Sequence, residues 1–256
     1  MRPRVIPVLL VEDRYVVKTV NFRKPAYIGD PINSVKLFNE KLADELMILD
    51  VLASERDGEI DFDFVAEIAS EAFMPIAYGG GISWLGDAER LFHLGVEKVV
   101  VNTASVTNPS LIGEIASAYG SQAVVASIDV NRSRMGRETV TYRRGRQTAS
   151  RLSPSEWARH LETLGAGEIL LTDVRREGTR SGYNLELVDA VSRAVSIPVI
   201  AHGGAGSLAD LGSAVSAGAS AVAAGSLFVQ HGAQRAVLIT YPTDDELTMS
   251  LQREGT

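Results

Sequence analysis

Carboxylates and one lysine stand at the ends of short apolar runs, where they could transfer protons. Asp50 and Asp129 each end such a run. Lys18 follows the first run, and Glu177 follows the sixth. A carboxylate at the carboxyl end of a buried strand has few structural duties, so we interpret Asp129 as a general acid or base. Asp50 could have the same role, or it could cap a loop or pair with Lys18.

Two glycine-rich segments could bind phosphate groups. They are Gly79-Gly80-Gly81-Ile82, after the third apolar run, and Gly203-Gly204-Ala205-Gly206, after the seventh. Backbone N–H groups in such turns can approach a phosphate closely, and the next helix adds its positive end. Asn102-Thr103 after the fourth run and Gly225-Ser226 after the eighth could complete two sites. One such loop alone would more often be only a tight turn, but the matched pair favours a substrate with a phosphate at each end.

The elements that must position these residues alternate between strands and helices. Short runs rich in Val, Ile and Leu, separated by helix-length segments, are typical of parallel strands buried on both faces. The predicted strands are 5–11, 46–51, 75–78, 98–102, 123–129, 168–173, 198–201 and 221–224. The predicted helices are 32–41, 61–72, 85–94, 109–119, 155–164, 185–194 and 208–217. This pattern predicts an α/β fold of the (β/α)8 barrel type, with an open doubly wound sheet as the alternative.

An internal repeat favours the barrel over the open sheet. Residues 45–51 (ELMILDV) resemble residues 168–174 (EILLTDV), and Gly79-Gly80 resembles Gly203-Gly204 at nearly the same separation along the chain. Two half-barrels of four strand–helix units each would produce this repeat. We therefore expect one barrel domain over 1–256, with half-barrels at about 1–120 and 121–240. A polar tail from about 244 to 256 is expected to be frayed.

Composition and charge exclude several classes of protein. The chain has 256 residues, of which 45% are hydrophobic and 22% charged, and it has no cysteine, so a disulfide scaffold and a cysteine nucleophile are excluded. Lys+Arg 25 against Asp+Glu 32 gives a net charge of −7, the wrong sign for general binding to nucleic acid or an anionic membrane. No apolar stretch reaches the ~18 residues of a spanning helix. We expect a soluble cytoplasmic protein with no metal and no cofactor.

Several motifs together resemble the cyclase subunit of imidazole glycerol phosphate synthase, an enzyme of histidine biosynthesis, and its paralogues. The similarity runs from residue 4 to about 228, and its motifs are VVK at 16–18, GGGI at 79–82, VNTA at 101–104, GSQAVV at 120–125, GAGEILL at 165–171, GTRSGY at 178–183 and GGAG at 203–206. The resemblance implies a barrel of duplicated halves, a glutaminase partner docked on its N-terminal face, and ammonia passing through the barrel to the opposite mouth. It also implies a phosphorylated or nucleotide-linked small-molecule substrate, with Gly178, Thr179 and His202 at its binding site.

Four charged residues stand at the starts of predicted strands and should form a ring at the N-terminal end of the barrel. They are Arg4, Glu45, Lys98 and Glu168. A stabilising ring of charges is the plain interpretation. The resemblance implies that this ring is the gate through which ammonia enters.

The chain also departs from the cyclase pattern. The family uses two aspartates as general acid and base; Asp129 matches the second, whereas Leu10 stands at the first. Glu177 occupies a family aspartate position, and His202 replaces a small residue. Loss of one member of an acid–base pair costs on the order of 10²–10⁴ in rate. The histidine-pathway reaction is therefore not the function that we favour.

A second group of segments points to a particular set of paralogues. Residues 9–11, 18–20, 77–81 and 228–242 resemble the paralogues associated with glycosyl amidation. These act with a glutaminase homologue and an ATP-dependent sugar amidotransferase, which convert an acetamido group of a surface-polysaccharide sugar into an acetamidino group. Our leading hypothesis is that the chain supplies ammonia to that reaction. The alternatives are an authentic cyclase subunit and a catalytically silent barrel that activates the glutaminase.

An arginine-rich segment follows the fifth predicted strand. Its arginines are Arg132, Arg134, Arg137, Arg143, Arg144, Arg146 and Arg151. The alternating residues 138–142 between them could form a hairpin. We interpret the segment as a solvated basic loop, with a docking or steering patch for an anionic substrate or partner as the alternative.

Overall fold

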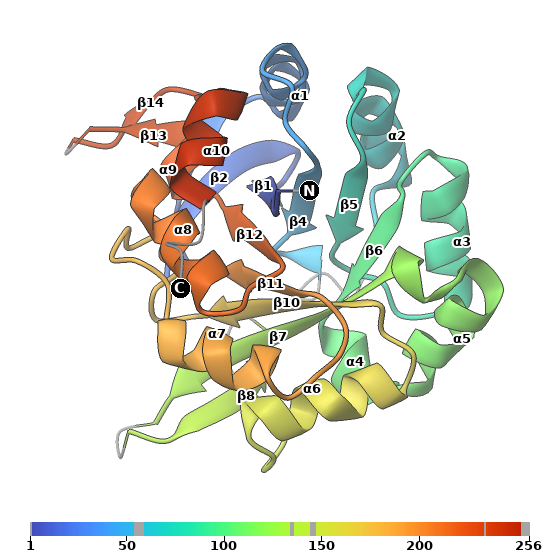
Figure 1. Ribbon diagram of the computed structural model, residues 1–256. Coiled ribbons are helices and arrows are strands. Elements are labelled where there is room, and N and C mark those ends of the chain that lie inside the picture. The colour runs from blue at the N-terminus through green and yellow to red at the C-terminus, as the bar shows by residue number, and fades with distance from the viewer. Residues whose placement is uncertain (1, 54–58, 134–135, 144–146, 233, 252–256) are drawn as a thin grey trace.

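The computed structural model describes residues 2–53, 59–133, 136–143, 147–232 and 234–251. In this part of the chain, eight parallel strands form a barrel with helices arranged around its outside (Figure 1). The barrel strands are β1 (Arg4–Glu12), β4 (Leu46–Asp50), β5 (Ile76–Gly79), β6 (Lys98–Val101), β7 (Val124–Arg132), β10 (Glu168–Asp173), β11 (Val199–His202) and β12 (Ala221–Ala224). All eight predicted strands are thus present.

The sheet closes on itself, which distinguishes the barrel from an open sheet. The hydrogen-bonded order is β10-β11-β12-β1-β4-β5-β6-β7, and β10 also pairs with β7. In that closing pair Leu170 lies opposite Ser127, and Thr172 lies opposite Asp129. The prediction of a (β/α)8 barrel is confirmed. The boundary between half-barrels near residue 120 stays a prediction.

Helices follow the barrel strands as the periodicity predicts. They are α1 (Pro31–Glu40), α2 (Phe62–Glu71), α3 (Leu85–His93), α4 (Thr103–Thr107), α5 (Ser110–Tyr119), α6 (Pro154–Thr163), α7 (Leu185–Ser192), α8 (Leu208–Ser216), α9 (Ser226–Val229) and α10 (Asp244–Leu251), with a 3-10 turn at Ser121–Ala123. Polar side chains cap several of them; the Asp30 carboxylate accepts a hydrogen bond from the Asn33 backbone N–H at 2.8 Å. None of the helices in the described ranges has the length and hydropathy needed to cross a bilayer.

Alternate residues of each strand enter two different apolar cores. On β1, Val5 and Leu9 pack outward against the helices. Ile6, Val8 and Leu10 pack inward, in a cluster that fills the middle of the barrel. Both faces of the strand are therefore buried, which explains why the strands read as continuous apolar runs.

Two antiparallel hairpins extend the barrel sheet, and a further antiparallel pair forms a separate two-stranded sheet. β2 (Tyr15–Val20) pairs with the end of β1 and with β3 (Arg23–Gly29). β8 (Glu138–Tyr142) pairs with the end of β7 and with β9 (Gln147–Thr148), and β13 (Gln230–His231) pairs with β14 (Ala236–Val237). The hairpin expected at 138–142 is present as β8. Arg134, Arg144 and Arg146 lie outside the described residues.

The C-terminal tail differs from the expectation. Residues 244–251 are not frayed but form α10, which packs against α8. Leu247 and Leu251, four residues apart on one face, are buried. The Thr243 backbone N–H and hydroxyl both donate to the Glu246 carboxylate, at 2.8 and 2.9 Å, and so begin the helix. Residues 252–256 lie outside the described part of the chain.

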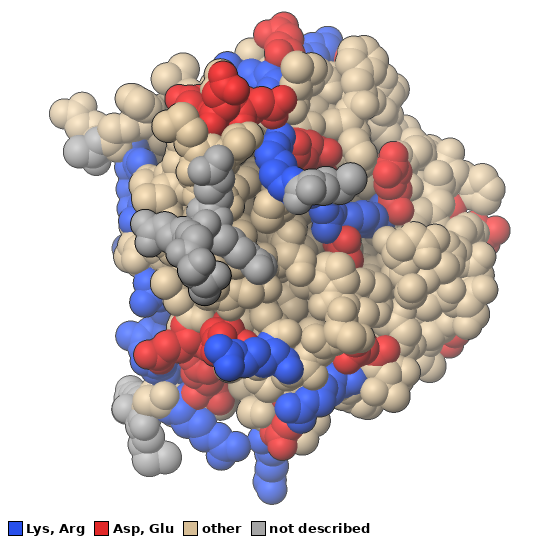
Figure 2. All heavy atoms as spheres, in the orientation of Figure 1, with Lys and Arg blue, Asp and Glu red and all other residues tan. Residues whose placement is uncertain are grey.

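The surface carries charges of both signs. Figure 2 shows acidic and basic side chains interspersed on the face in view rather than one continuous basic surface. This distribution agrees with the small negative net charge of the chain. It gives no extended cationic face for a nucleic-acid backbone on this side of the molecule.

Candidate functional site at the carboxyl ends of the barrel strands

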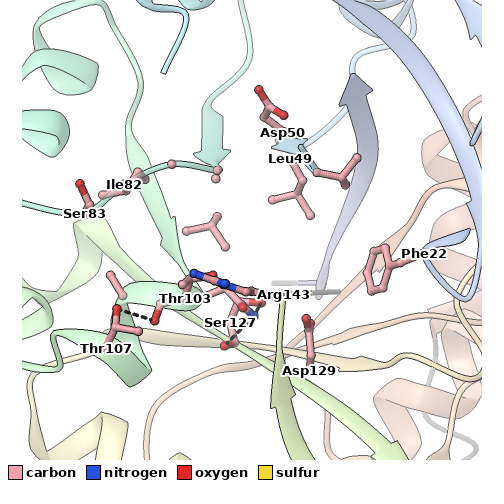
Figure 3. Close-up of a pocket in the computed structure, with 17 residues that line it drawn as sticks. Phe22, Leu49, Asp50, Ile82, Ser83, Thr103, Thr107, Ser127, Asp129 and Arg143 are labelled. Atoms are coloured by element: carbon pink, nitrogen blue, oxygen red, sulfur yellow. Dashed lines mark hydrogen bonds between the residues drawn. The ribbon is translucent and has the colours of Figure 1, made fainter. Parts of the chain in front are cut away.

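A hollow opens at the carboxyl ends of β4, β5, β6 and β7 (Figure 3). Its volume is about 390 Å³. Its lining includes the predicted site residues Asp50, Gly80, Gly81, Asn102, Thr103 and Asp129. We call it the first cavity. One of the two predicted phosphate loops therefore lies beside the favoured acid–base residue.

Asp129 is buried in the first cavity in a way that changes its acidity. Its side chain is 7% exposed, and burial raises the pKa of its carboxyl to about 7. A hydrogen bond from Asn102 acts in the opposite direction, and the charge of Glu177 adds to the rise. A group that titrates near neutral pH can both hold and release a proton, as general acid–base catalysis requires.

Leu10 faces the same interior from the opposite half of the chain. It is fully buried among the apolar side chains that fill the barrel, including Val8 and Met47. On the strand, Leu10 is inward-facing near the carboxyl end of β1, as Asp129 is on β7. No proton can be transferred by leucine, so the two positions are not equivalent chemically.

Asp50 has a structural role at the rim of the first cavity. Its Oδ1 accepts hydrogen bonds from the backbone N–H groups of Leu52 at 2.9 Å and Ala53 at 3.0 Å, so it caps the loop after β4. Gly80 lies against it with φ of +126°, and a Cβ at Gly80 would stand 2.6 Å from the Asp50 carbonyl oxygen. Only glycine fits this turn without displacing the chain.

The second predicted phosphate loop encloses a much smaller hollow, with a volume of about 10 Å³. We call it the second cavity; its lining includes Lys18, Glu177, Gly178, His202, Gly203, Gly204, Gly225 and Ser226. Thr179 is not among the described residues that line it. The Thr179 hydroxyl instead donates to the Arg176 carbonyl oxygen at 2.7 Å.

Lys18 reaches the second cavity from β2. Its side chain is 4% exposed, and burial lowers the pKa of its ammonium to about 8, although the charge of Glu177 opposes this shift. A Cβ at Gly225 would stand 1.9 Å from Lys18 Nζ, so the amine lies directly on the glycine backbone. A larger residue at this position would displace the amine.

Glu177 holds the β2–β3 hairpin to the barrel. Its buried carboxylate accepts hydrogen bonds from the Thr19 hydroxyl at 2.9 Å and from the Phe22 backbone N–H at 2.7 Å. Its own carbonyl oxygen accepts from the Asn21 backbone N–H at 2.9 Å. This sequence-predicted catalytic residue thus has three contacts that position Lys18 and Phe22 over the mouth of the barrel.

Burial favours the uncharged form of the His202 imidazole. Burial, with a smaller contribution from the charge of Lys18, lowers the pKa of its imidazole to about 3. Its Nδ1 lies 3.0 Å from the Thr172 hydroxyl on the neighbouring strand. The ring therefore presents hydrogen-bonding groups without charge at the wall of the second cavity.

The four charged residues expected at the N-terminal end do form a ring. Each carboxylate contacts both cations: Glu45 pairs with Arg4 and with Lys98, the latter at 3.2 Å. Glu168 pairs with Arg4 at 2.7 Å and with Lys98 at 3.2 Å. Burial alone would lower the pKa of Arg4, but the charges of Glu45 and Glu168 outweigh it and raise that pKa. The ring closes one end of the apolar barrel interior.

Several residues that line the first cavity are not among the predicted site residues. Phe22, Ser127 and Arg143 are three of them. Ser127 could be predicted from the sequence, because it stands two residues before Asp129 and so faces the same side of the strand. Phe22 and Arg143 come from hairpin turns, and no spacing rule places such residues in a barrel mouth. Arg143 does belong to the arginine-rich segment whose alternative interpretation is a patch for an anionic substrate or partner.

The fold and the site define a class of protein: a closed (β/α)8 barrel with hollows and glycine-rich loops where its strands end. Residues 4–234 match the model of the family described as "Histidine biosynthesis protein". The chain belongs to this family. It is 51% identical to the "Putative imidazole glycerol phosphate synthase subunit hisF2" of Pseudomonas aeruginosa, over 96% of this chain and 98% of that protein.

Other relatives carry similar names. The chain is 42% identical to the "Putative imidazole glycerol phosphate synthase subunit HisF" of Leptospira borgpetersenii, over 96% of this chain and 98% of that protein. It is 44% identical to the "Imidazole glycerol phosphate synthase subunit HisF" of Streptomyces griseus, over 88% of this chain and 89% of that protein. The chain is thus a HisF-like member of the family.

Proposed function

We propose that this chain is a HisF-like synthase subunit that receives ammonia from a glutaminase and delivers it through the barrel for amidation of a surface-polysaccharide sugar. The acceptor's acetamido group becomes an acetamidino group, with an ATP-dependent amidotransferase completing the reaction. We favour amidation over the histidine-pathway reaction because of Leu10. This residue is fully buried at the position that matches Asp129 on the opposite half of the barrel.

The barrel interior supports transport of ammonia. Between the ring of Arg4, Glu45, Lys98 and Glu168 and the first cavity, the inward-facing side chains are apolar. Neutral ammonia can enter such an interior at far lower cost than an ammonium ion, whose charge would be unpaired there. We propose that the ring is the gate on the face where the glutaminase docks, and that it admits ammonia when the partner shifts one of its ion pairs.

The mouth supports binding of an anionic substrate. We propose that Gly80, Gly81, Asn102 and Thr103 bind one phosphate, and that Gly178, Thr179, His202, Gly203, Gly204, Gly225 and Ser226 contact a second group of the substrate. Asp129 is the proposed proton-transfer residue in the first cavity, and Lys18 supplies positive charge in the second cavity. Glu177 and Asp50 hold the loops that carry these groups. The substrate is a phosphorylated or nucleotide-linked small molecule.

An authentic cyclase subunit is the second candidate, and it is favoured by the retained Asp129 and Lys18 and by the names of the relatives. The test is turnover of the ribonucleotide substrate of imidazole glycerol phosphate synthase by the purified chain, with ammonium salt replacing glutamine. We expect no imidazole glycerol phosphate. Robust product formation would refute the amidation proposal. The Leu10→Asp variant, which restores a carboxylate, should gain turnover only if the rest of the cyclase site is intact.

The gate is tested in the complex with its glutaminase. Glu45→Ala and Lys98→Ala should lower the ratio of product formed to glutamine hydrolysed, while turnover with ammonium salt is retained. Lys36→Ala is the matched control, because it removes a surface ion pair with Glu71 on the outside of the barrel. Unchanged coupling in both gate variants would contradict transport and favour the third hypothesis, a catalytically silent scaffold that activates the glutaminase.

A further inference from the structure

The described lining of the first cavity includes two carboxylates and one arginine. They are Asp50, Asp129 and Arg143. The Asp50 carboxylate holds its own loop through Leu52 and Ala53. Burial favours the uncharged form of Asp129. Arg143 is thus the cation in the described lining of a hollow that the proposed function assigns to an anionic substrate.

The position of Arg143 is set by the barrel itself. β8 is paired with β7, with Thr141 opposite Asp129, and the Thr141 hydroxyl donates to the Asp129 carbonyl oxygen at 3.1 Å. Arg143 follows two residues later, where a φ of +51° turns the chain out of β8. Figure 3 shows its side chain reaching toward Thr103 and Ser127 across the cavity. The guanidinium is therefore placed by a hairpin anchored on a barrel strand.

Among the described residues, the guanidinium of Arg143, which is exposed, has no hydrogen-bond or ion-pair partner. Two other arginines at the carboxyl ends of the strands do have partners. Arg132 pairs with Glu138 at 3.4 Å, and Arg176 donates to the Gly182 carbonyl oxygen at 3.0 Å. In the part of the chain that the structure describes, no side chain or carbonyl group accepts a hydrogen bond from Arg143. A planar group with five N–H donors thus lines the first cavity without accepting groups from the described residues.

We propose that Arg143 is a substrate-binding residue, whose guanidinium binds a phosphate group of the substrate in the first cavity opposite Gly81 and Thr103. This inference rests on the proposed function, which places a phosphorylated substrate at this mouth. Arginine forms paired N–H···O bonds with phosphate, and such charge-assisted bonds are about twice as strong as neutral ones. Because Arg143 comes from the turn after β8, it lines the cavity from a different element than the glycine-rich loop after β5.

Binding of ribose 5-phosphate by the full chain tests this assignment, with ribose as the uncharged comparison. Isothermal titration calorimetry gives the affinity, and backbone amide shifts of nitrogen-15-labelled protein at Gly81 and Thr103, against Gly204 and Gly225, give the cavity occupied. We expect Arg143→Gln to weaken ribose 5-phosphate binding roughly tenfold. Arg143→Lys should recover part of the loss. Arg193→Gln, which removes an exposed charge at the C-cap of α7, is the matched control and should bind as the wild type does.

The outcomes distinguish a failure of the Arg143 assignment from a failure of the proposed phosphorylated substrate. If the wild type binds ribose 5-phosphate with shifts at Gly81 and Thr103 but Arg143→Gln binds equally well, the role of Arg143 is refuted and the phosphate site stands. If the shifts appear only at Gly204 and Gly225, the first cavity is not the phosphate site and Arg143 has no phosphate to bind. If the wild type binds neither ribose 5-phosphate nor inorganic phosphate, the proposed phosphorylated substrate is refuted as well.

Discussion

Replacing Asp129 with asparagine should change how the stability of this protein depends on pH. The carboxyl has an ordinary pKa of 3.8 and a pKa of about 7 in the fold, because burial disfavours its charged form. Between these values the folded protein binds more protons than the unfolded chain, so the wild type loses stability as the pH rises through this window. Asparagine has nearly the same shape and does not titrate. From the two pKa values, the wild type should lose about 2.5 kcal/mol relative to Asp129→Asn between pH 5 and pH 8.

Urea denaturation of both proteins at pH 5 and pH 8 measures this difference. Subtracting the variant cancels the titration of the remaining groups, including Lys18, whose low pKa has the opposite effect at higher pH. Asp189→Asn, at a half-exposed carboxylate on α7, should differ from the wild type by the same amount at both pH values. A difference between wild type and Asp129→Asn that stays constant within about 0.5 kcal/mol would refute the burial argument.

Three further variants test other contacts of the fold. Lys98→Met leaves the buried Glu45 and the partly buried Glu168 facing one arginine. It should lower the free energy of unfolding by roughly 3 kcal/mol in urea denaturation; a change below 1 kcal/mol would contradict the ion-pair ring. Glu177→Gln weakens the acceptor of the Phe22 backbone N–H, so hydrogen exchange at that amide should become about tenfold faster. An unchanged exchange rate would show that other contacts hold the hairpin. Tyr241→Phe removes the hydroxyl that donates to the Val5 carbonyl oxygen at 2.8 Å. It should lower the free energy of unfolding by about 1–2 kcal/mol in thermal unfolding, and an unchanged melting temperature would contradict this role.

The barrel could be predicted from the sequence because its signals are local. Buried parallel strands require apolar side chains on both faces, and helices such as α6 begin at a recognisable cap, where Ser153 and Glu156 bond to each other's backbone N–H groups. Glycine at 80 and at 204 marked turns with positive φ, where a side chain would collide with the backbone of a neighbouring loop. These requirements act within a few residues, so the spacing alone reveals them.

The hairpins of the mouth were harder to predict. The β2–β3 turn places Asn21 and Phe22 at φ of 56° and 53°, and phenylalanine gives no signal for that conformation. The turn is maintained by Glu177, which is more than 150 residues away in the sequence. Arg143 likewise enters the first cavity only because β8 pairs with β7 in one register. Such contacts form only in the closed barrel, and no local sequence pattern predicts them.

The pairing of β1 with β12 has a consequence for synthesis of the protein. Arg4 lies opposite Ala221, so the first barrel strand obtains its second neighbour only when nearly the whole chain has been made. Until then, one edge of β1 and its apolar faces remain available to other chains. Barrels that close between such distant segments fold slowly and are prone to aggregation while incomplete. We expect expression at lower temperature to increase the soluble yield, because slower synthesis and weaker apolar association both favour closure within one chain.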